Sequence, residues 1–81
     1  MNLKPATRFQ FVALSIGRAR DPRQRRVEML WVKACGGEVF QDAAGSRYAV
    51  FDPTTKPPRA LLLRCATRLL DIVPIEWTRL G

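Results

Sequence analysis

The sequence contains no histidine and only two cysteines. A structural zinc site commonly takes four histidine or cysteine ligands, so we expect neither a metal site nor a cofactor. General acid–base chemistry would fall to seven carboxylates and three lysines. No glycine-rich loop of the nucleotide-binding kinds is present. We therefore expect a binding protein and not an enzyme, with no catalytic residues.

Long apolar runs are also missing. The stretch from Phe9 to Ile16 is far shorter than the roughly 18 residues that a membrane span needs. It follows Lys4 and Arg8, as in a signal peptide, but it lacks a small-x-small cleavage site and runs directly into Gly17. We read it as part of the fold and expect one compact domain over residues 1–81, cytoplasmic and without a membrane partner.

Positive charge is what the sequence has in excess. The formal net charge is +7, and all but three of the 14 basic residues are arginine, whose planar donor fork suits phosphates and carboxylates. Five arginines crowd the nine positions from residue 18 to residue 26, namely Arg18, Arg20, Arg23, Arg25 and Arg26. The dipole of a helix that begins there would destabilise each nearby cation by roughly 0.3–1 kcal/mol. An anionic partner bound at the helix start would make this interaction favourable instead. We predict that this cluster, together with Arg47, binds nucleic acid or an acidic protein surface.

The alternative interpretation of the cluster is a solvated loop and helix face. Arginine is a good helix former, and Asp21 offsets the helix dipole. Glu28 lies three residues after Arg25, a spacing that allows the two side chains to pair on a helix.

The first half of the chain predicts a strand, a helix and two further strands. Residues 7–16 are rich in aromatic and branched side chains and favour a central strand, although a helix also fits their spacing. Asp21-Pro22 supplies an N-cap and a first helical residue, and Gly36-Gly37 ends the helix. Its expected core stripe follows the i, i+3, i+4, i+7 rule and comprises Val27, Leu30, Trp31 and Ala34. Residues 38–41 and 47–51 then predict a hairpin.

The second half predicts a helix and a last strand. A helix is expected from Pro57 or Pro58 to about Asp71, with a core stripe of Leu62, Cys65, Ala66 and Leu69. Pro74 breaks that pattern, and residues 75–80 predict an edge strand. The order βαββαβ favours a ferredoxin-like α+β sandwich, with a four-stranded antiparallel sheet and two helices on one face.

Aromatic side chains give the expected open sheet face a possible role. Phe9 and Phe11 would face outward on the first strand, and Tyr48 and Trp77 would join them from the third and fourth. Aromatics on an open sheet stack nucleic-acid bases at about 1–3 kcal/mol per base. Residues 46–51 resemble the third-strand motif of RNA-recognition-motif domains, but without its glycine and second outward aromatic, so no family function is inferred. Alternatively, these aromatics belong to the core or to a homodimer interface.

Four further residues have structural interpretations. Cys35 and Cys65 fall on expected helices among apolar neighbours, so we expect free, buried thiols. A disulfide between them is the alternative. Asp42 and Asp52 flank the expected hairpin, where aspartates usually bond to local backbone groups. A magnesium-binding carboxylate pair is the less favoured alternative.

Two functions follow from these observations. The first is a small, basic, non-enzymatic protein that binds nucleic acid or a nucleoprotein complex through the arginine-rich turn and helix start. The second is a phage- or plasmid-type inhibitor, similar to anti-CRISPR proteins in its size and lack of motifs, which docks on a host protein complex. A structural homodimer is a third option.

Overall fold

The computed structural model describes residues 10–17 and 21–81, and these form an α+β structure. The elements in chain order are β1 (Phe11–Gly17), α1 (Pro22–Ala34), β2 (Glu38–Gln41), β3 (Arg47–Phe51), α2 (Arg59–Arg64), β4 (Thr67–Leu70) and β5 (Thr78–Leu80). The strands form one sheet in the order β4-β1-β3-β2-β5, and every neighbouring pair is antiparallel. The antiparallel sheet and the two helices agree with the sequence prediction.

The sheet has five strands in this part of the chain, so the prediction of four was wrong. The error lies in the expected helix up to Asp71, because α2 ends at Arg64 and Cys65 already has extended backbone angles. Residues 67–70 instead pair with β1, from Leu14 opposite Thr67 to Phe11 opposite Leu70. Pairing satisfies the backbone groups along that side of β1, which a longer α2 would leave without partners. The last strand is also shorter than expected and begins at Thr78.

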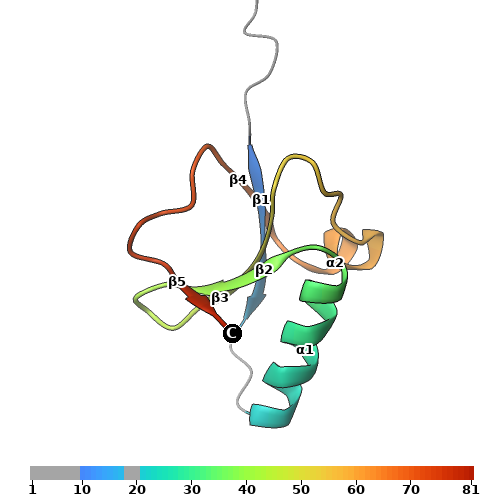
Figure 1. Ribbon diagram of the computed structural model, residues 1–81, viewed down its shortest axis with the longest axis vertical. Coiled ribbons are helices and arrows are strands. Elements are labelled where there is room, and N and C mark those ends of the chain that lie inside the picture. Colours follow the sequence, from blue (N-terminus) through green and yellow to red (C-terminus); the bar gives the residue numbers. More distant parts are fainter. Residues whose placement is uncertain (1–9, 18–20) are drawn as a thin grey trace, which may run out of the picture.

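Both helices pack on the same face of the sheet (Figure 1). Val32 of α1 and Leu61 of α2 meet Leu14, Val39 and Phe51 from three strands in one buried cluster. The chain passes very close to this cluster just after α1, because a Cβ added at Gly37 would lie 2.7 Å from the Phe51 ring. Neither helix within the described residues is long and apolar enough to cross a membrane.

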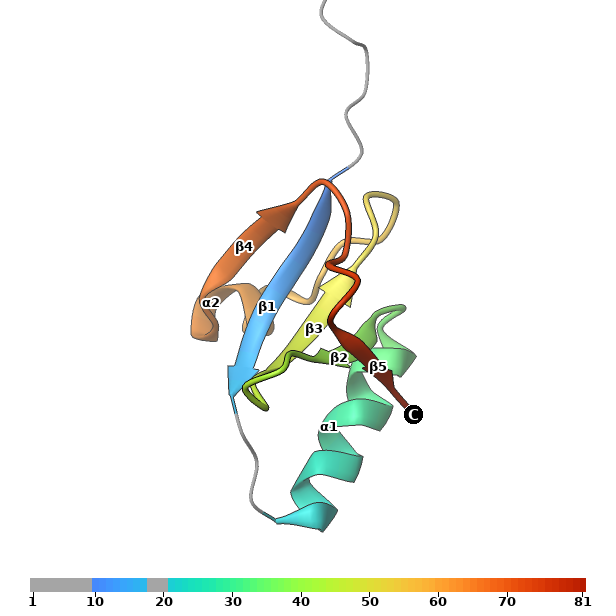
Figure 2. The same cartoon turned by 90° about the vertical axis from the view of Figure 1, so that its left-hand side faces the viewer.

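The opposite face of the sheet is covered, contrary to the expected open face. The connection from β4 to β5 runs across it, on the side away from the helices (Figures 1 and 2). From this connection, Val73 and Trp77 pack against a second buried cluster of Ala13, Val50 and Leu70. The segment that follows β4 therefore covers the sheet face that was expected to be open.

The ends of α1 follow the sequence signals. The Arg23 backbone N–H donates to Asp21 Oδ1 at 2.9 Å, and Pro22 occupies the first helical position. After the C-cap residue Cys35, Gly36 adopts φ +89° and its N–H donates to the Lys33 carbonyl, while the Gly37 N–H donates to that of Val32. This arrangement satisfies carbonyls that the end of a helix leaves unpaired.

The predicted core stripes of both helices were wrong. On α1, Val27, Leu30 and Trp31 are 65%, 62% and 42% exposed, and the buried residue is Val32. The first turns of α1 extend beyond the ends of the strands in both views (Figures 1 and 2), so no sheet lies under the start of the helix. On the short α2, Leu61 is buried while Leu62 is exposed. Helical spacing marked an apolar face on α1, but that face is turned to solvent.

Candidate anion-binding surface on the first helix

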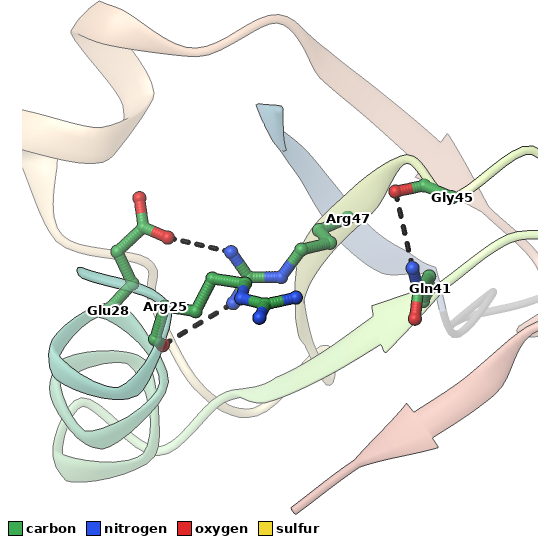
Figure 3. Close-up of polar contacts among 5 residues, drawn as sticks. All are labelled: Arg25, Glu28, Gln41, Gly45 and Arg47. Carbon is green, nitrogen blue, oxygen red and sulfur yellow. Dashed lines mark hydrogen bonds and ion pairs between the residues drawn. The ribbon is translucent and has the colours of Figure 1, made fainter. Parts of the chain in front are cut away.

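The exposed arginines of α1 form the most strongly charged part of the described chain. Arg23, Arg25 and Arg26 lie in its first turns, are all exposed, and have no acidic residue beside them in the first turn. No ion pair or hydrogen bond to another described residue holds their guanidinium groups. We call these three residues the arginine surface; Arg23 and Arg26 share the outer face of the helix, whereas the Arg25 side chain extends toward Arg47 (Figure 3). Arg18 and Arg20, the other members of the predicted cluster, lie outside the described residues.

Arg47 lies apart from this surface. Its side chain is only 3% exposed, and it points from β3 toward α1, where Nη1 donates to Glu28 Oε1 at 2.8 Å (Figure 3). Nη2 donates to the Arg25 carbonyl at 3.5 Å, while the buried Nε has no hydrogen-bond partner. A guanidinium held in this way cannot reach an external ligand, so we leave Arg47 out of the proposed site.

The ion pair with Arg47 also changes the electrostatics of α1. Glu28 is the sole acidic residue of this helix, and the sequence offered Arg25 as its partner. Because Glu28 instead pairs with Arg47 beneath the helix, no carboxylate of α1 is free to neutralise the arginine surface. The one carboxylate left near the arginine surface is that of the N-cap residue Asp21, which precedes the helix, so positive charge is in excess at the helix start.

An apolar stripe continues the arginine surface along α1. Val27, Leu30 and Trp31 follow Arg23 and Arg26 at the spacing of one helical face, and all of them are exposed. Exposed apolar groups in such a row commonly mark a contact surface.

A pocket of about 390 Å³ opens between α1, α2 and the end of β1. Its apolar lining includes Ile16, Trp31, Leu61 and Cys65, and its charged lining consists of Glu28 from α1 and Arg64 from α2. Its volume falls in the range of small-ligand sites. The pocket could not be predicted from the sequence, because its walls come from three separate segments of the chain.

The predicted stacking residues lie on the other side of the sheet. The Tyr48 and Trp77 rings stack on each other, with centroids 4.3 Å apart and planes 8° from parallel. Tyr48 Oη also donates to Asp42 Oδ2 at 3.2 Å, and Phe11 is half-buried against the second cluster. These rings therefore hold the β4–β5 connection on the sheet, while Phe9 lies outside the described residues.

Both predicted turn aspartates bond to their own turns. Asp42 Oδ1 accepts from the backbone N–H groups of Ala44 and Ser46, at 3.0 and 2.9 Å. Asp52 Oδ1 accepts from the Thr54 hydroxyl and backbone N–H, and these bonds hold the pKa of this exposed carboxyl below its usual value. The turn interpretation is confirmed. Cys35 and Cys65 are both free and half-buried.

Comparison with known proteins adds no functional assignment to this geometry. No protein-family model matches the chain, and no similar curated protein or solved structure was found.

Proposed function

We propose that the protein is a non-enzymatic binder of nucleic acid or of a nucleoprotein complex, acting through the arginine surface of α1. The observation that carries this proposal is the set of three exposed guanidinium groups at Arg23, Arg25 and Arg26, none paired with a described residue. Grouping three cations at the positive end of a helix is unfavourable, and the single N-cap carboxylate of Asp21 offsets only part of that charge. Guanidinium groups bind phosphates through paired hydrogen bonds, and a nucleic-acid backbone presents phosphates in a repeating array.

One observation favours a second candidate, a protein-binding regulator of the phage or plasmid type. The apolar stripe Val27, Leu30 and Trp31 is exposed directly beside the arginine surface. A phosphate backbone makes no use of valine and leucine side chains, whereas a protein partner would bury them. In this candidate the arginines pair with acidic side chains at the rim of the interface.

We propose in addition that β1–β4 and the two helices form a ferredoxin-like pair of split βαβ units, to which β5 is added. The strand order supports it, because β1 and β2 flank β3 and are joined through α1. Likewise, β3 and β4 flank β1 and are joined through α2.

A salt titration tests nucleic-acid binding. If each of the three arginines engages one phosphate, the logarithm of the affinity for duplex DNA falls with the logarithm of salt concentration at a slope of roughly −3. The variant Arg25→Glu/Arg26→Glu should lose most of the affinity and most of that slope. The matched control is Arg68→Glu/Arg79→Glu, which makes the same charge change at exposed positions of β4 and β5. Equal loss in both variants would show only a net-charge effect and would contradict the proposed surface.

Co-purification with and without nuclease separates the two candidates. A nucleic-acid partner is removed by nuclease, and the protein then elutes alone. A direct protein complex survives the treatment and is lost in Leu30→Asp, which places a charge in the apolar stripe. A nuclease-resistant complex with little affinity for free DNA or RNA would replace the first candidate with the second.

A further inference from the structure

We propose that the pocket between α1 and α2 receives one unstacked base of a single-stranded nucleic acid whose phosphates lie on the arginine surface. This inference rests on the proposed nucleic-acid binding and specifies its ligand. It places base recognition on the helical side of the molecule, and not on the sheet face that the sequence suggested.

Position is the first support for this assignment. Trp31 forms part of the pocket wall and also ends the exposed face of α1 that begins with Arg23 and Arg26. A strand held by its phosphates at the start of α1 would therefore have the pocket within its path. The Trp31 side chain is 42% exposed, so its ring is accessible to a base from solvent.

The chemistry of the lining selects a base over simpler ligands. Glu28 supplies carboxylate oxygens and Arg64 supplies N–H donors, while Trp31 and Leu61 supply apolar surface. With one carboxylate and one guanidinium, the lining lacks the excess of positive charge that would favour a lone phosphate or carboxylate anion. A purely apolar side chain of a protein would remove water from Glu28 and Arg64 without replacing their hydrogen bonds. A nucleobase has a flat apolar face and an edge of donors and acceptors, so it suits both parts of the pocket.

Arg64 is available for this role. No hydrogen bond or ion pair to another described residue holds its guanidinium. Unstacked bases in single-strand binders lie on aromatic rings, such as indole, and on planar guanidinium groups. Glu28, in contrast, is already oriented by its 2.8 Å bond to Arg47. The pocket thus combines one fixed acceptor with one donor group that can adjust to the ligand.

The test uses a short single-stranded DNA and its own duplex as probes, with Trp77→Phe as the background. Trp77 stacks on Tyr48 on the sheet face opposite the helices, away from the pocket. Its replacement by phenylalanine leaves Trp31 as the sole tryptophan reporter. We expect single-stranded DNA to quench the Trp31 emission. In the same background, Trp31→Ala leaves no tryptophan, so its binding is followed by the fluorescence anisotropy of dye-labelled DNA. This variant should bind the single strand about tenfold more weakly and leave duplex binding unchanged.

A pair of arginine variants supplies the matched control. Arg64→Gln should weaken single-strand binding several-fold more than Arg68→Gln, which removes the same charge elsewhere. Arg68 lies on the sheet face opposite the helices, because it is the cross-strand partner of Ala13 from the second buried cluster. Circular dichroism melts would confirm that each variant is folded.

The outcomes separate this inference from the proposed function. Single-strand binding that is lost on reversal of Arg25 and Arg26, but not in Trp31→Ala, overturns the pocket while the arginine surface stands. No affinity for either probe overturns both proposals. Equal effects of Arg64→Gln and Arg68→Gln would show that Arg64 contributes only to the net charge. That result would also overturn the proposal that the pocket binds a base.

Discussion

At the scale of single residues, the buried Arg47 determines how charge is distributed on α1. Its guanidinium pairs with the carboxylate of Glu28, so α1 itself has no other acidic residue to pair with its exposed arginines. The sequence contained both partners, but helical spacing favoured Arg25 as the neighbour of Glu28. Only the placement of β3 beneath α1 brings residues 28 and 47 together, and that placement depends on tertiary packing.

The ion pair makes a direct prediction for stability. Glu28→Gln leaves a buried guanidinium without a countercharge and should lower the free energy of unfolding by about 2–4 kcal/mol, the smaller value reflecting the 27% exposure of the Glu28 side chain. Urea denaturation measures the loss. Glu76→Gln is the control, because Glu76 is exposed and should change stability by less than about 0.5 kcal/mol. The double variant Glu28→Leu/Arg47→Met should recover most of the loss. If both single variants unfold at the same urea concentration, the pair contributes nothing to stability.

At the scale of secondary-structure elements, local signals were enough for α1 and for the β2–β3 hairpin. Asp21-Pro22, Gly36-Gly37 and the turn at Asp42 each bond within a few residues of themselves, as the sequence predicted. The segment after Arg64 has no such local determinant. Leu62, Cys65 and Leu69 fit a helical stripe, but the unpaired side of β1 takes residues 67–70 as a strand. A non-local pairing overrode helical periodicity there, and it also changed which apolar residues are exposed.

The β4–β5 connection gives a prediction for one element. Trp77→Ala should lower the free energy of unfolding by about 2–3 kcal/mol, because it removes both the stack on Tyr48 and the contact with the second buried cluster. Ile75 lies in the same connection but is 95% exposed, so Ile75→Ala is the matched control and should have little effect. Near-ultraviolet circular dichroism during thermal unfolding follows both variants. Comparable melting temperatures for the two would mean that the connection does not cover the sheet in solution.

At the scale of the whole molecule, the formal net charge is +7. Of the described basic residues, Arg47 is the one that is buried, and the others are at least partly accessible to solvent. Exposed like charges raise the free energy of the compact state and attract anions. If the arginine surface binds an anionic partner, as proposed, the protein trades some stability for that binding, a trade-off that is common at binding surfaces.

This trade-off can be measured in the protein without any ligand. Arg25→Gln/Arg26→Gln should raise the melting temperature at low salt by about 2–6 °C, because it removes cations from the positive end of the α1 dipole. The gain should shrink in high salt, since exposed charges are then screened within a few ångströms. Arg68→Gln/Arg79→Gln makes the same change in net charge away from any helix start and should gain less. If the α1 variant gained nothing at low salt, the arginines would not repel one another in the free protein. The physical reason for expecting an anion on this helix would then disappear, whatever the variant did to binding.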